Sequence, residues 1–598
     1  MTAAGQHHRP FGVRARVLVG SALVGAALSV AATVSGAGEG PEAPGIFVPS
    51  TGSHTCFGRR PGCTPLRGPH EYVDAVLSPD SRTLYLLGDG LAVLSRDAVT
   101  GDLQQLAGQH GCLSQITTRA CTHIGGEPSF FGAVRLEIAA GGRLAYAGFL
   151  SGRLQALRRD PVTGALTPVR GHGGCVGPDT GCIEELSLGD WRLVPDGGVL
   201  LLPSSDRVRT ARPDAATGHL RLVRGRRGCV SVGARPGCTA LRGLRAVRDH
   251  GLPVPLMIAL SDDGRSMLVM DARGAIALLA RDPLSGAARQ LRGRAGCFTA
   301  HGDRGCRRLR GDRGAGLAAY LDGGRRVLLW TDDSACYGET SNNEPTCSGE
   351  PALAGLIRSG PAGGFVQPSG PKGCVRPRGG EGCARGDIGT LNLDPPIPGR
   401  HITVARDGRS AYLPGGHSLQ TVTVAGAGPG LRLLALPNGC PQGAGDCAPS
   451  QNALCSVDAF TLGHDPRWAY ALSGETVVTL QRDPASGALR IARAPYLLTP
   501  CGSLRAALAV DPSGQFAYQL LGALDTLTIL HQCACPDGPP PTPTPGPTVT
   551  ASPSTTPSPG SSPQSPALDR ARHGRRSNAG AGLLRLRAPS TPHPASVE

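Results

Sequence analysis

The sequence predicts an all-β chain folded as a β-propeller of four-stranded blades, with eight blades, or seven as the alternative. Three observations support this prediction: a short turn that recurs eight times between apolar runs, a second turn that follows it, and regularly placed cysteine pairs. With 87 glycines, 53 prolines and 4% aromatic residues among 598, long helices are not expected. At about 150 residues per domain the length suggests four domains, and the repeats replace that estimate with one ring.

The first recurring turn contains Asp-Gly or a close variant and lies between two short apolar runs, which is typical of a β-hairpin. Its copies are at 78–80, 139–142, 194–197, 261–264, 321–324, 405–408, 463–466 and 511–514.

The second turn has the pattern Arg-Asp-Pro-x-Ser/Thr-Gly, with alanine in place of proline in the copy at 96–101. Proline fixes φ and glycine supplies a positive φ, so each copy reverses the chain between two further strands. A unit with both turns has four antiparallel strands, and such units repeated radially make a propeller. The copies are at 96–101, 159–164, 281–286 and 482–487, with a degenerate one at 212–218.

The chain ends predict how the ring closes. The eighth unit has its second and third strands, at 516–520 and 526–530, but a polar tail follows before any fourth. Residues 45–48 precede Cys56 as residues 164–167 precede Cys175. We therefore expect the N-terminal strand to be the fourth strand of the last blade, which ties the ring shut and covers its edges.

Twenty cysteines mark the units, mostly as local pairs seven or nine residues apart, unlike the C-x2-C spacing of zinc sites. We predict about one structural disulfide per blade. Cys455, Cys501, Cys533 and Cys535 remain, with three possible connectivities. The predicted pairs are Cys56/Cys63, Cys112/Cys121, Cys175/Cys182, Cys229/Cys238, Cys297/Cys306, Cys336/Cys347, Cys374/Cys383 and Cys440/Cys447.

The chain termini indicate export. Residues 1–37 have a basic start, an apolar run at 17–34 and small residues before Gly38, the layout of a cleaved secretory signal, with an uncleaved anchor as the alternative. Disulfides are the rule in the oxidising compartment that such a signal reaches. We expect a propeller at 38–536, a Pro/Thr/Ser-rich spacer at 537–566 and a basic disordered tail at 567–598.

The net charge of +15 lies partly at the termini, which leaves about +8 for the body. Basic residues are not interleaved with aromatic ones as in a nucleic-acid groove, so we expect no nucleic-acid partner. We expect a secreted or cell-surface monomer with no membrane span after signal removal and with no cofactor.

Candidate site residues lie on the predicted innermost strands of the blades. These strands line a central channel, and the mouth of that channel is the usual site in propellers. Acid, base and imidazole converging there would bind an anion and move a proton. The alternative is ion pairing between blades, Asp74 with Arg135 and Glu137 with Arg192, which needs no ligand. The predicted catalytic residues are Glu137 and His401, and the predicted ligand-binding residues are Asp74, Arg135, Asp190 and Arg192.

The longest insertion follows Trp330 and places carboxylates and amides on a loop bracketed by Cys336 and Cys347. Such oxygen ligands suit calcium, but the spacing of a calcium loop is absent. We predict a solvated acidic loop and no metal site.

The turns resemble the YVTN and lactonase-like β-propeller repeats of bacteria over roughly residues 44–535. The matching residues are 78–86 (SPDSRTLYL), 159–166 (RDPVTGAL) and 228–231 (GCVS). The resemblance implies the fold, in a family that includes sugar-lactone hydrolases, muconate-lactonising enzymes and propellers with no known reaction. Lactonase propellers have seven blades and generally no cysteine pair per blade, and no catalytic motif of theirs matches here.

Two functions follow from these observations. The first is an exported binding or scaffold module for an extracellular protein, glycan or cell-wall component. The second is a secreted hydrolase that acts on sugar lactones or carboxy-lactones at the central channel.

Overall fold

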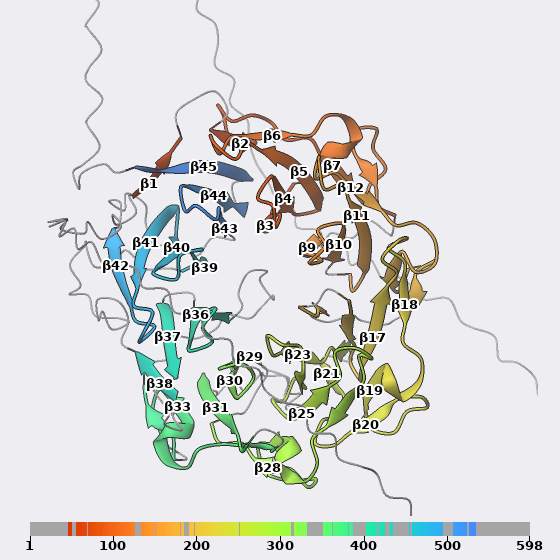
Figure 1. The fold of residues 1–598 in the computed structure, drawn as a ribbon, viewed down its shortest axis with the longest axis vertical. Helices are drawn as coiled ribbons and strands as arrows, with labels where there is room; N and C mark the ends of the chain where they lie inside the picture. Colours follow the sequence, from red (N-terminus) through yellow and green to blue (C-terminus); the bar gives the residue numbers. More distant parts are fainter. Residues whose placement is uncertain are drawn as a thin grey trace, which may run out of the picture. The chain divides into compact units, whose positions relative to one another are not determined.

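The computed structural model describes residues 46–533, apart from 51–54, 69, 126–132, 150, 180, 185–190, 196–197, 250–251, 312–315, 332–350, 361–362, 381, 387–401, 416–417, 425–430, 435–453, 455–456, 494–505 and 523–524. Within these residues, eight blade sheets follow one another around a ring in the unit that ends at Asp537 (Figure 1). The predicted all-β propeller with eight blades is confirmed. Each blade places its first strand at the centre and its last strands at the rim.

Blades 1 to 3 have six strands each. Blade 1 contains β3 (Asp74–Leu77), β4 (Thr83–Leu87), β5 (Gly90–Arg96), β6 (Leu103–Gln105), β7 (Cys112–Ser114) and β8 (Thr122–His123). Blade 2 contains β9 (Ala133–Ile138), β10 (Leu144–Phe149), β11 (Leu154–Arg159), β12 (Leu166–Pro168), β13 (Cys175–Gly177) and β14 (Ile183–Glu184). Blade 3 contains β15 (Arg192–Leu193), β16 (Leu200–Pro203), β17 (Arg207–Pro213), β18 (Leu220–Leu222), β19 (Cys229–Val232) and β20 (Thr239–Leu241).

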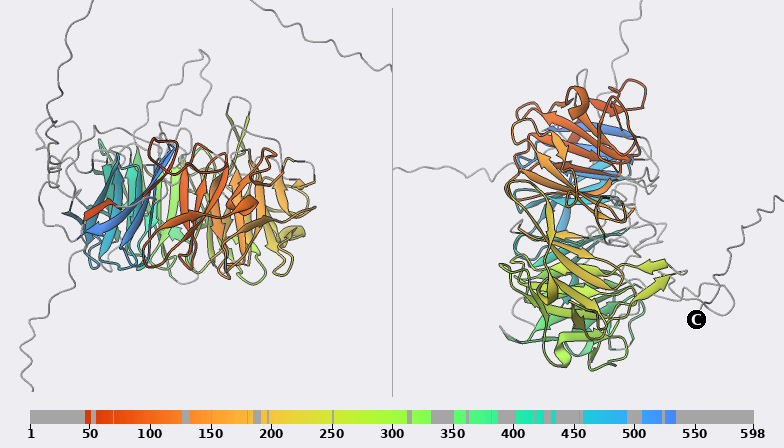
Figure 2. Two further views of the ribbon diagram at one scale, coloured as in Figure 1. Left: turned by 90° about the horizontal axis from the view of Figure 1, so that it is seen from above. Right: turned by 90° about the vertical axis from the view of Figure 1, so that its right-hand side faces the viewer.

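Blades 4 and 5 repeat this pattern. A separate hairpin, β21 (Val247–Asp249) and β22 (Leu252–Val254), precedes blade 4 and projects from one face of the ring (Figure 2). Blade 4 contains β23 (Met257–Leu260), β24 (Ser266–Met270), β25 (Ile276–Arg281), β26 (Ala288–Gln290), β27 (Cys297–Thr299) and β28 (Arg307–Arg308). Blade 5 contains β29 (Gly316–Leu321), β30 (Arg326–Thr331), β31 (Ala352–Arg358), β32 (Phe365–Val366), β33 (Cys374–Arg376) and β34 (Ala384–Arg385).

Blades 6 and 7 have four described strands each. Blade 6 contains β35 (Thr403–Val404), β36 (Ser410–Gly415), β37 (Ser418–Val424) and β38 (Leu431–Leu434). Blade 7 contains β39 (Ala459–Leu462), β40 (Trp468–Ser473), β41 (Thr476–Arg482) and β42 (Leu489–Arg493).

Blade 8 joins the two ends of the propeller, as predicted. It contains β43 (Ala506–Val510), β44 (Phe516–Leu521), β45 (Thr526–Cys533), β1 (Ile46–Pro49) and β2 (Cys56–Gly58). Both β1 and β2 pair antiparallel with β45, with Phe47 opposite Gln532 and Phe57 opposite Leu527. The N-terminal segment thus covers the edge that β45 would otherwise expose.

The rims of blades 1 to 5 are more elaborate than the four antiparallel strands that the sequence predicts. In blade 1, β6 and β7 both pair with β5, because the turn η1 (Gly108–Gly111) interrupts the fourth strand. Strand β8 then pairs parallel to β7. Blades 3, 4 and 5 have the equivalent turns η2 (Gly225–Arg227), η3 (Arg294–Gly296) and η4 (Gly370–Gly373).

The hydrophobic core is divided among the eight junctions between neighbouring blades, each with its own cluster of buried side chains. At the junction of blades 8 and 1, Leu84 and Leu94 pack with Tyr518. Since every core is shared by two blades, each blade is stable only with its neighbours in place.

The two recurring turns meet across the blade junctions. In blade 2, Arg159 of the second turn donates from Nη2 to Asp80 of the first turn of blade 1, at 2.9 Å, and from Nε to Tyr85 Oη, at 2.7 Å. Tyr85 donates in turn to the carbonyl of Gly164, at 2.8 Å. Arg482, Asp407 and Tyr412 repeat this latch between blades 7 and 6.

The same latch joins blade 1 to blade 8 and closes the ring. Arg96 Nη2 lies 3.0 Å from Asp511 Oδ2, with side chains only 2% and 5% exposed. Arg96 also donates to Tyr518 Oη, and Tyr518 donates to the carbonyl of Gly101, at 2.9 Å. These groups are 415 to 422 residues apart in sequence, so the latch fixes the two ends of the propeller together.

Candidate functional site

Two places in the structure gather polar side chains: the inner strands of blades 1 to 3 and the outer rim. On the inner strands, Asp74 lies on β3, Arg135 and Glu137 on β9, and Arg192 on β15. All four are partly buried. Asp190 and His401, the other predicted site residues, lie outside the described residues, so their roles remain predictions.

Arg135 and Glu137 form an ion pair within β9, with Arg135 Nε 2.7 Å from Glu137 Oε1. The other oxygen of Glu137 accepts a hydrogen bond from the backbone N–H of Leu193 in blade 3, at 3.0 Å. The Arg135 guanidinium also lies 5.5 Å from the ring centre of Trp191, a cation–π contact. Glu137 therefore reaches blade 3 through a backbone amide, whereas the sequence suggested the side chain of Arg192.

Asp74 is the carboxylate with the most altered acidity in this group. Burial raises its pKa to about 6, although the backbone N–H of Ala75 and the nearby charge of Arg135 act in the opposite direction. A carboxyl group with such a pKa exchanges its proton near neutral pH, and a neighbouring arginine is suited to hold an anion. The inner strands thus combine a proton-exchanging group with a cation.

The outer rim is held by six local disulfides in the described part of the chain, with Cα–Cα distances of 4.6 to 4.9 Å. Each joins two cysteines that the sequence pairs, so these six predictions are confirmed. The disulfides are Cys56–Cys63, Cys112–Cys121, Cys175–Cys182, Cys229–Cys238, Cys297–Cys306 and Cys374–Cys383.

Two further predicted disulfides are not confirmed, because their cysteines lie outside the described residues. Cys447 and its expected partner Cys440 fall within 435–453, so the structure does not test the pair predicted there. Cys336 and Cys347 fall within 332–350 together with the acidic loop, and that pair also stays a prediction.

The four cysteines left without a predicted partner are described only in part. Cys533 is disulfide-bonded, with a partner outside the described residues. Cys455, Cys501 and Cys535 lie outside them as well, so the connectivity of these four stays open.

A Leu-Arg-Gly segment after the second cysteine connects each of three rim loops to the next blade, a role that the sequence reasoning missed. Its glycine packs directly on the next disulfide: a Cβ atom on Gly68 would lie 2.7 Å from Cys112 Cβ and 2.8 Å from Cys121 Sγ. The backbone N–H of the adjoining Arg67 donates to Gln105 Oε1, and Gln105 Nε2 donates to the Arg67 carbonyl, both at 2.9 Å. The signal available was the recurrence itself, at 66–68, 241–243 and 309–311.

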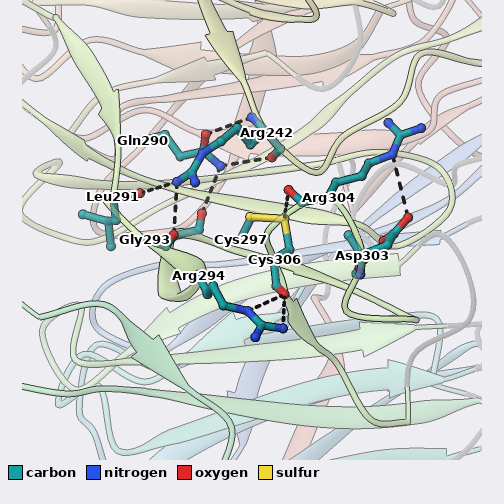
Figure 3. Close-up of a disulfide and its surroundings, with 11 residues drawn as sticks. Arg242, Gln290, Leu291, Gly293, Arg294, Cys297, Asp303, Arg304 and Cys306 are labelled. Carbon is teal, nitrogen blue, oxygen red and sulfur yellow. Dashed lines mark hydrogen bonds and ion pairs between the residues drawn. A yellow bond between two sulfur atoms is a disulfide. The ribbon is translucent and has the colours of Figure 1, made fainter.

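Figure 3 shows the same arrangement around the Cys297–Cys306 disulfide of blade 4. Arg242, from blade 3, donates to the carbonyls of Leu291 and Gly293 at 3.2 and 3.1 Å. Arg294 donates to the carbonyl of Cys306 at 3.3 and 3.4 Å. Arginine side chains and the disulfide together fix this part of the rim.

A shallow cavity of about 470 Å³ lies beside this disulfide, between blades 3 and 4. Its lining includes Arg242, Arg245 and Arg304 together with Leu241 and Leu244. Within the mapped portion of the chain, no group of three or more histidine, cysteine or acidic side chains is placed to hold a metal ion. No helix among the residues that the structure places is long and apolar enough to span a membrane.

Comparisons with known proteins give structural neighbours only. No protein-family model matches the chain, and no curated protein matches its sequence. Similar solved structures include a putative 6-phosphogluconolactonase from Bacteroides fragilis, with 12% identity, 60% of this chain and 82% of that chain covered, and a TM-score of 0.36. The propeller of Dos1 has 10% identity, covers 80% and 94%, and has a TM-score of 0.42. Sqt1 from Chaetomium thermophilum, bound to the N-terminus of ribosomal protein L10, has 11% identity, covers 77% and 97%, and has a TM-score of 0.42.

Proposed function

We propose that this chain is an exported propeller that serves as a binding module for an extracellular component, with its rim as the binding surface. Export rests on the signal-like segment at 1–37, and the six described disulfides agree with an oxidising compartment.

The observation that carries the proposal is the cross-linking of the rim loops. Rim loops rich in glycine are expected to be mobile, yet here each described loop is closed by a disulfide between cysteines seven or nine positions apart. Leu-Arg-Gly segments then fasten three of these loops to the neighbouring blade. A surface ordered before binding loses less conformational entropy on association, which favours a macromolecular partner on the rim.

A lactone hydrolase remains the second candidate, and Asp74 is the observation in its favour. Its raised pKa lets it act as an acid or base near neutral pH. Arg135 would bind the lactone carboxylate in that case. Against this role, Glu137 is already held by Arg135 and by the Leu193 amide.

Two assays on the exported full chain separate the candidates. Saturable binding to an extracellular envelope fraction, with no hydrolysis of a panel of sugar lactones and carboxy-lactones, is the expected result. The lactone hydrolase would be favoured over the binding module if the chain hydrolyses a lactone and Glu137→Gln or Asp74→Asn abolishes this activity. The circular dichroism of the variants must be unchanged, so that loss of the fold is excluded. Absence of binding to every envelope fraction would refute the proposal.

A further inference from the structure

The positive charge of the propeller is concentrated in blades 3 and 4. Residues 215–311 contain eighteen arginines and six aspartates, a net charge of +12. The whole chain has a net charge of +15, of which the two termini already supply seven. The rest of the propeller is therefore slightly acidic, and the arginines of blades 3 and 4 are a local feature.

Most of these arginines are on the surface of the rim. Between residues 221 and 245 all seven arginines are exposed and no acidic residue occurs. Between residues 289 and 308 five more are exposed, with Asp303 as the acidic residue of that segment. We call these twelve exposed side chains the basic rim.

The two segments of the basic rim lie side by side. Strand β19 of blade 3 contacts β26 of blade 4, and Figure 1 shows β18, β19, β20 and β28 at the outer edge of the ring. The cavity beside the Cys297–Cys306 disulfide lies where the two segments meet. The basic rim is thus one continuous surface across two blades.

Some members of the basic rim help to hold the fold, as Arg242 and Arg294 do by donating to backbone carbonyls, but others do not. Elsewhere, arginines such as Arg96 and Arg159 are buried in the blade latches, with side chains 2% exposed. On the basic rim, Arg226, Arg292 and Arg308 are exposed and form no ion pair with any residue that the structure describes. Clustered cations that are neither buried nor paired repel one another, which disfavours their accumulation unless a ligand compensates.

The cavity shows how an anion would be seated. Asp303 lies 3.6 Å from Arg245 and 3.8 Å from Arg304, so one carboxylate faces two guanidinium groups. Hydrogen bonding from Thr299 lowers the pKa of Asp303, which therefore stays ionised. The surplus positive charge in this cavity fits the acidic group of a sugar.

We propose that the basic rim of blades 3 and 4 binds an extended anionic polysaccharide, with one acidic sugar in the cavity. The inference rests on the proposed binding function and adds its surface and ligand class. A polymer fits because the charge runs along the convex edge of two blades. Among the described residues the large exposed apolar side chains are Val99, Ile116, Val162 and Leu284, so the rim has no aromatic platform for stacking nucleobases.

The test compares two triple variants of the exported full chain that change the net charge equally. The rim variant is Arg226→Glu, Arg292→Glu and Arg308→Glu. The control is Arg143→Glu, Arg325→Glu and Arg409→Glu, three exposed arginines in hairpin turns of blades 2, 5 and 6. Binding is measured for polygalacturonate, dextran sulfate, uncharged dextran and duplex DNA.

We expect wild type and control to bind polygalacturonate or dextran sulfate but not dextran, and the rim variant to bind at least about tenfold more weakly, with the difference shrinking at high salt. Whichever acidic polymer binds more tightly identifies the carboxylate or the sulfate-type group as the ligand. Equal affinity of rim and control variants, or tighter binding to DNA, would overturn the inference. If the rim variant still binds the envelope fraction as wild type does, the proposed function stands and the basic rim is not its surface.

Discussion

The buried ion pair between Arg96 and Asp511 should contribute more to the free energy of unfolding than the equivalent ion pairs of latches whose aspartate is exposed to water. Asp511 Oδ2 accepts hydrogen bonds from Arg96 Nη2 at 3.0 Å and Ser513 Oγ at 2.6 Å, and Oδ1 accepts from the Phe516 N–H at 3.0 Å. In Asp511→Asn the amide oxygen can keep the turn to Phe516, but the NH2 group then faces the Arg96 guanidinium. The substitution therefore leaves a buried cation unpaired.

Removing one partner of a buried ion pair typically lowers the free energy of unfolding by about 3 to 5 kcal/mol. We expect the lower end here, roughly 3 kcal/mol, because Arg96 keeps Tyr518 Oη and the Ser81 carbonyl as acceptors. Asp80→Asn is the matched control, since Asp80 makes the same contact with Arg159 but its side chain is 35% exposed. Water can replace that interaction, so we expect a loss of about 1 kcal/mol.

Equilibrium urea unfolding of both variants measures these losses as changes in the free energy of unfolding. The double variant Arg96→Met with Asp511→Asn should recover much of the stability, because it no longer buries an unpaired charge. If Asp511→Asn destabilises no more than Asp80→Asn, or if the two changes at Arg96 and Asp511 are additive, the assignment of the ring-closing role to this latch is refuted.

Three further predictions concern the rim and the inner strands. Gly68→Ala should lower the free energy of unfolding by at least about 2 kcal/mol, since its Cβ would overlap the Cys112–Cys121 disulfide. The control Gly62→Ala is also at positive φ but its Cβ meets open space, so it should cost about 1 kcal/mol; equal losses would contradict the prediction. Because the pKa of Asp74 is raised, its contribution to stability is present below the unfolded pKa near 4 and is lost as the pH rises through about 6. Asp74→Asn should therefore flatten the pH dependence of the free energy of unfolding between these values and add about 2 kcal/mol at pH 7. An unchanged pH profile would contradict this prediction. Replacing both Cys112 and Cys121 by serine should cost about 2 to 3 kcal/mol, from the loop-closure entropy of a nine-residue separation, measured by urea unfolding without reductant; an unaltered midpoint would contradict it.

The sequence predicted the repeating parts of the fold because their signals are local. Each hairpin turn has its own aspartate, glycine or proline. The third strand at 526–530 lacked a following fourth strand, which indicated that the N-terminal segment supplies it. The extra rim strands were missed because β8 and its equivalents have two or three residues, too few for an alternating pattern. Their parallel pairing depends on the disulfide loop that returns the chain alongside β7.

The contacts between blades were harder to predict than the blades. Arg159 was recognised as a turn residue, but its partner Asp80 belongs to the other recurring turn, 79 residues earlier. Spacing along the chain does not show which turns meet in space. The alternative of ion pairing between blades placed Glu137 with Arg192, but Glu137 accepts a hydrogen bond in blade 3 from the N–H of Leu193, which has no signature in the sequence.

The basic rim was not predicted from the sequence, because the net charge was averaged over the whole body of the chain. A net charge of about +8 spread over the body indicated a weak excess, and only the placement of residues 221–245 and 289–308 on neighbouring rims shows a concentrated surface. The four described candidate residues, Asp74, Arg135, Glu137 and Arg192, lie on the first strands of blades 1 to 3, and their roles in a site stay predictions. The part that Asp190 and His401 play there stays a prediction.

The measurement that tests the central claim most directly is disulfide mapping by mass spectrometry on the chain recovered from the culture medium, together with its N-terminal sequence. An exported propeller with a rigid stapled rim predicts an N-terminus at Gly38 and fully oxidised local pairs, including Cys112–Cys121, Cys229–Cys238 and Cys297–Cys306. The same map tests the predicted pairing of Cys447 with Cys440, which lies outside the described residues. Free thiols at these positions, pairs that join different blades, or retention of the chain inside the cell would contradict it.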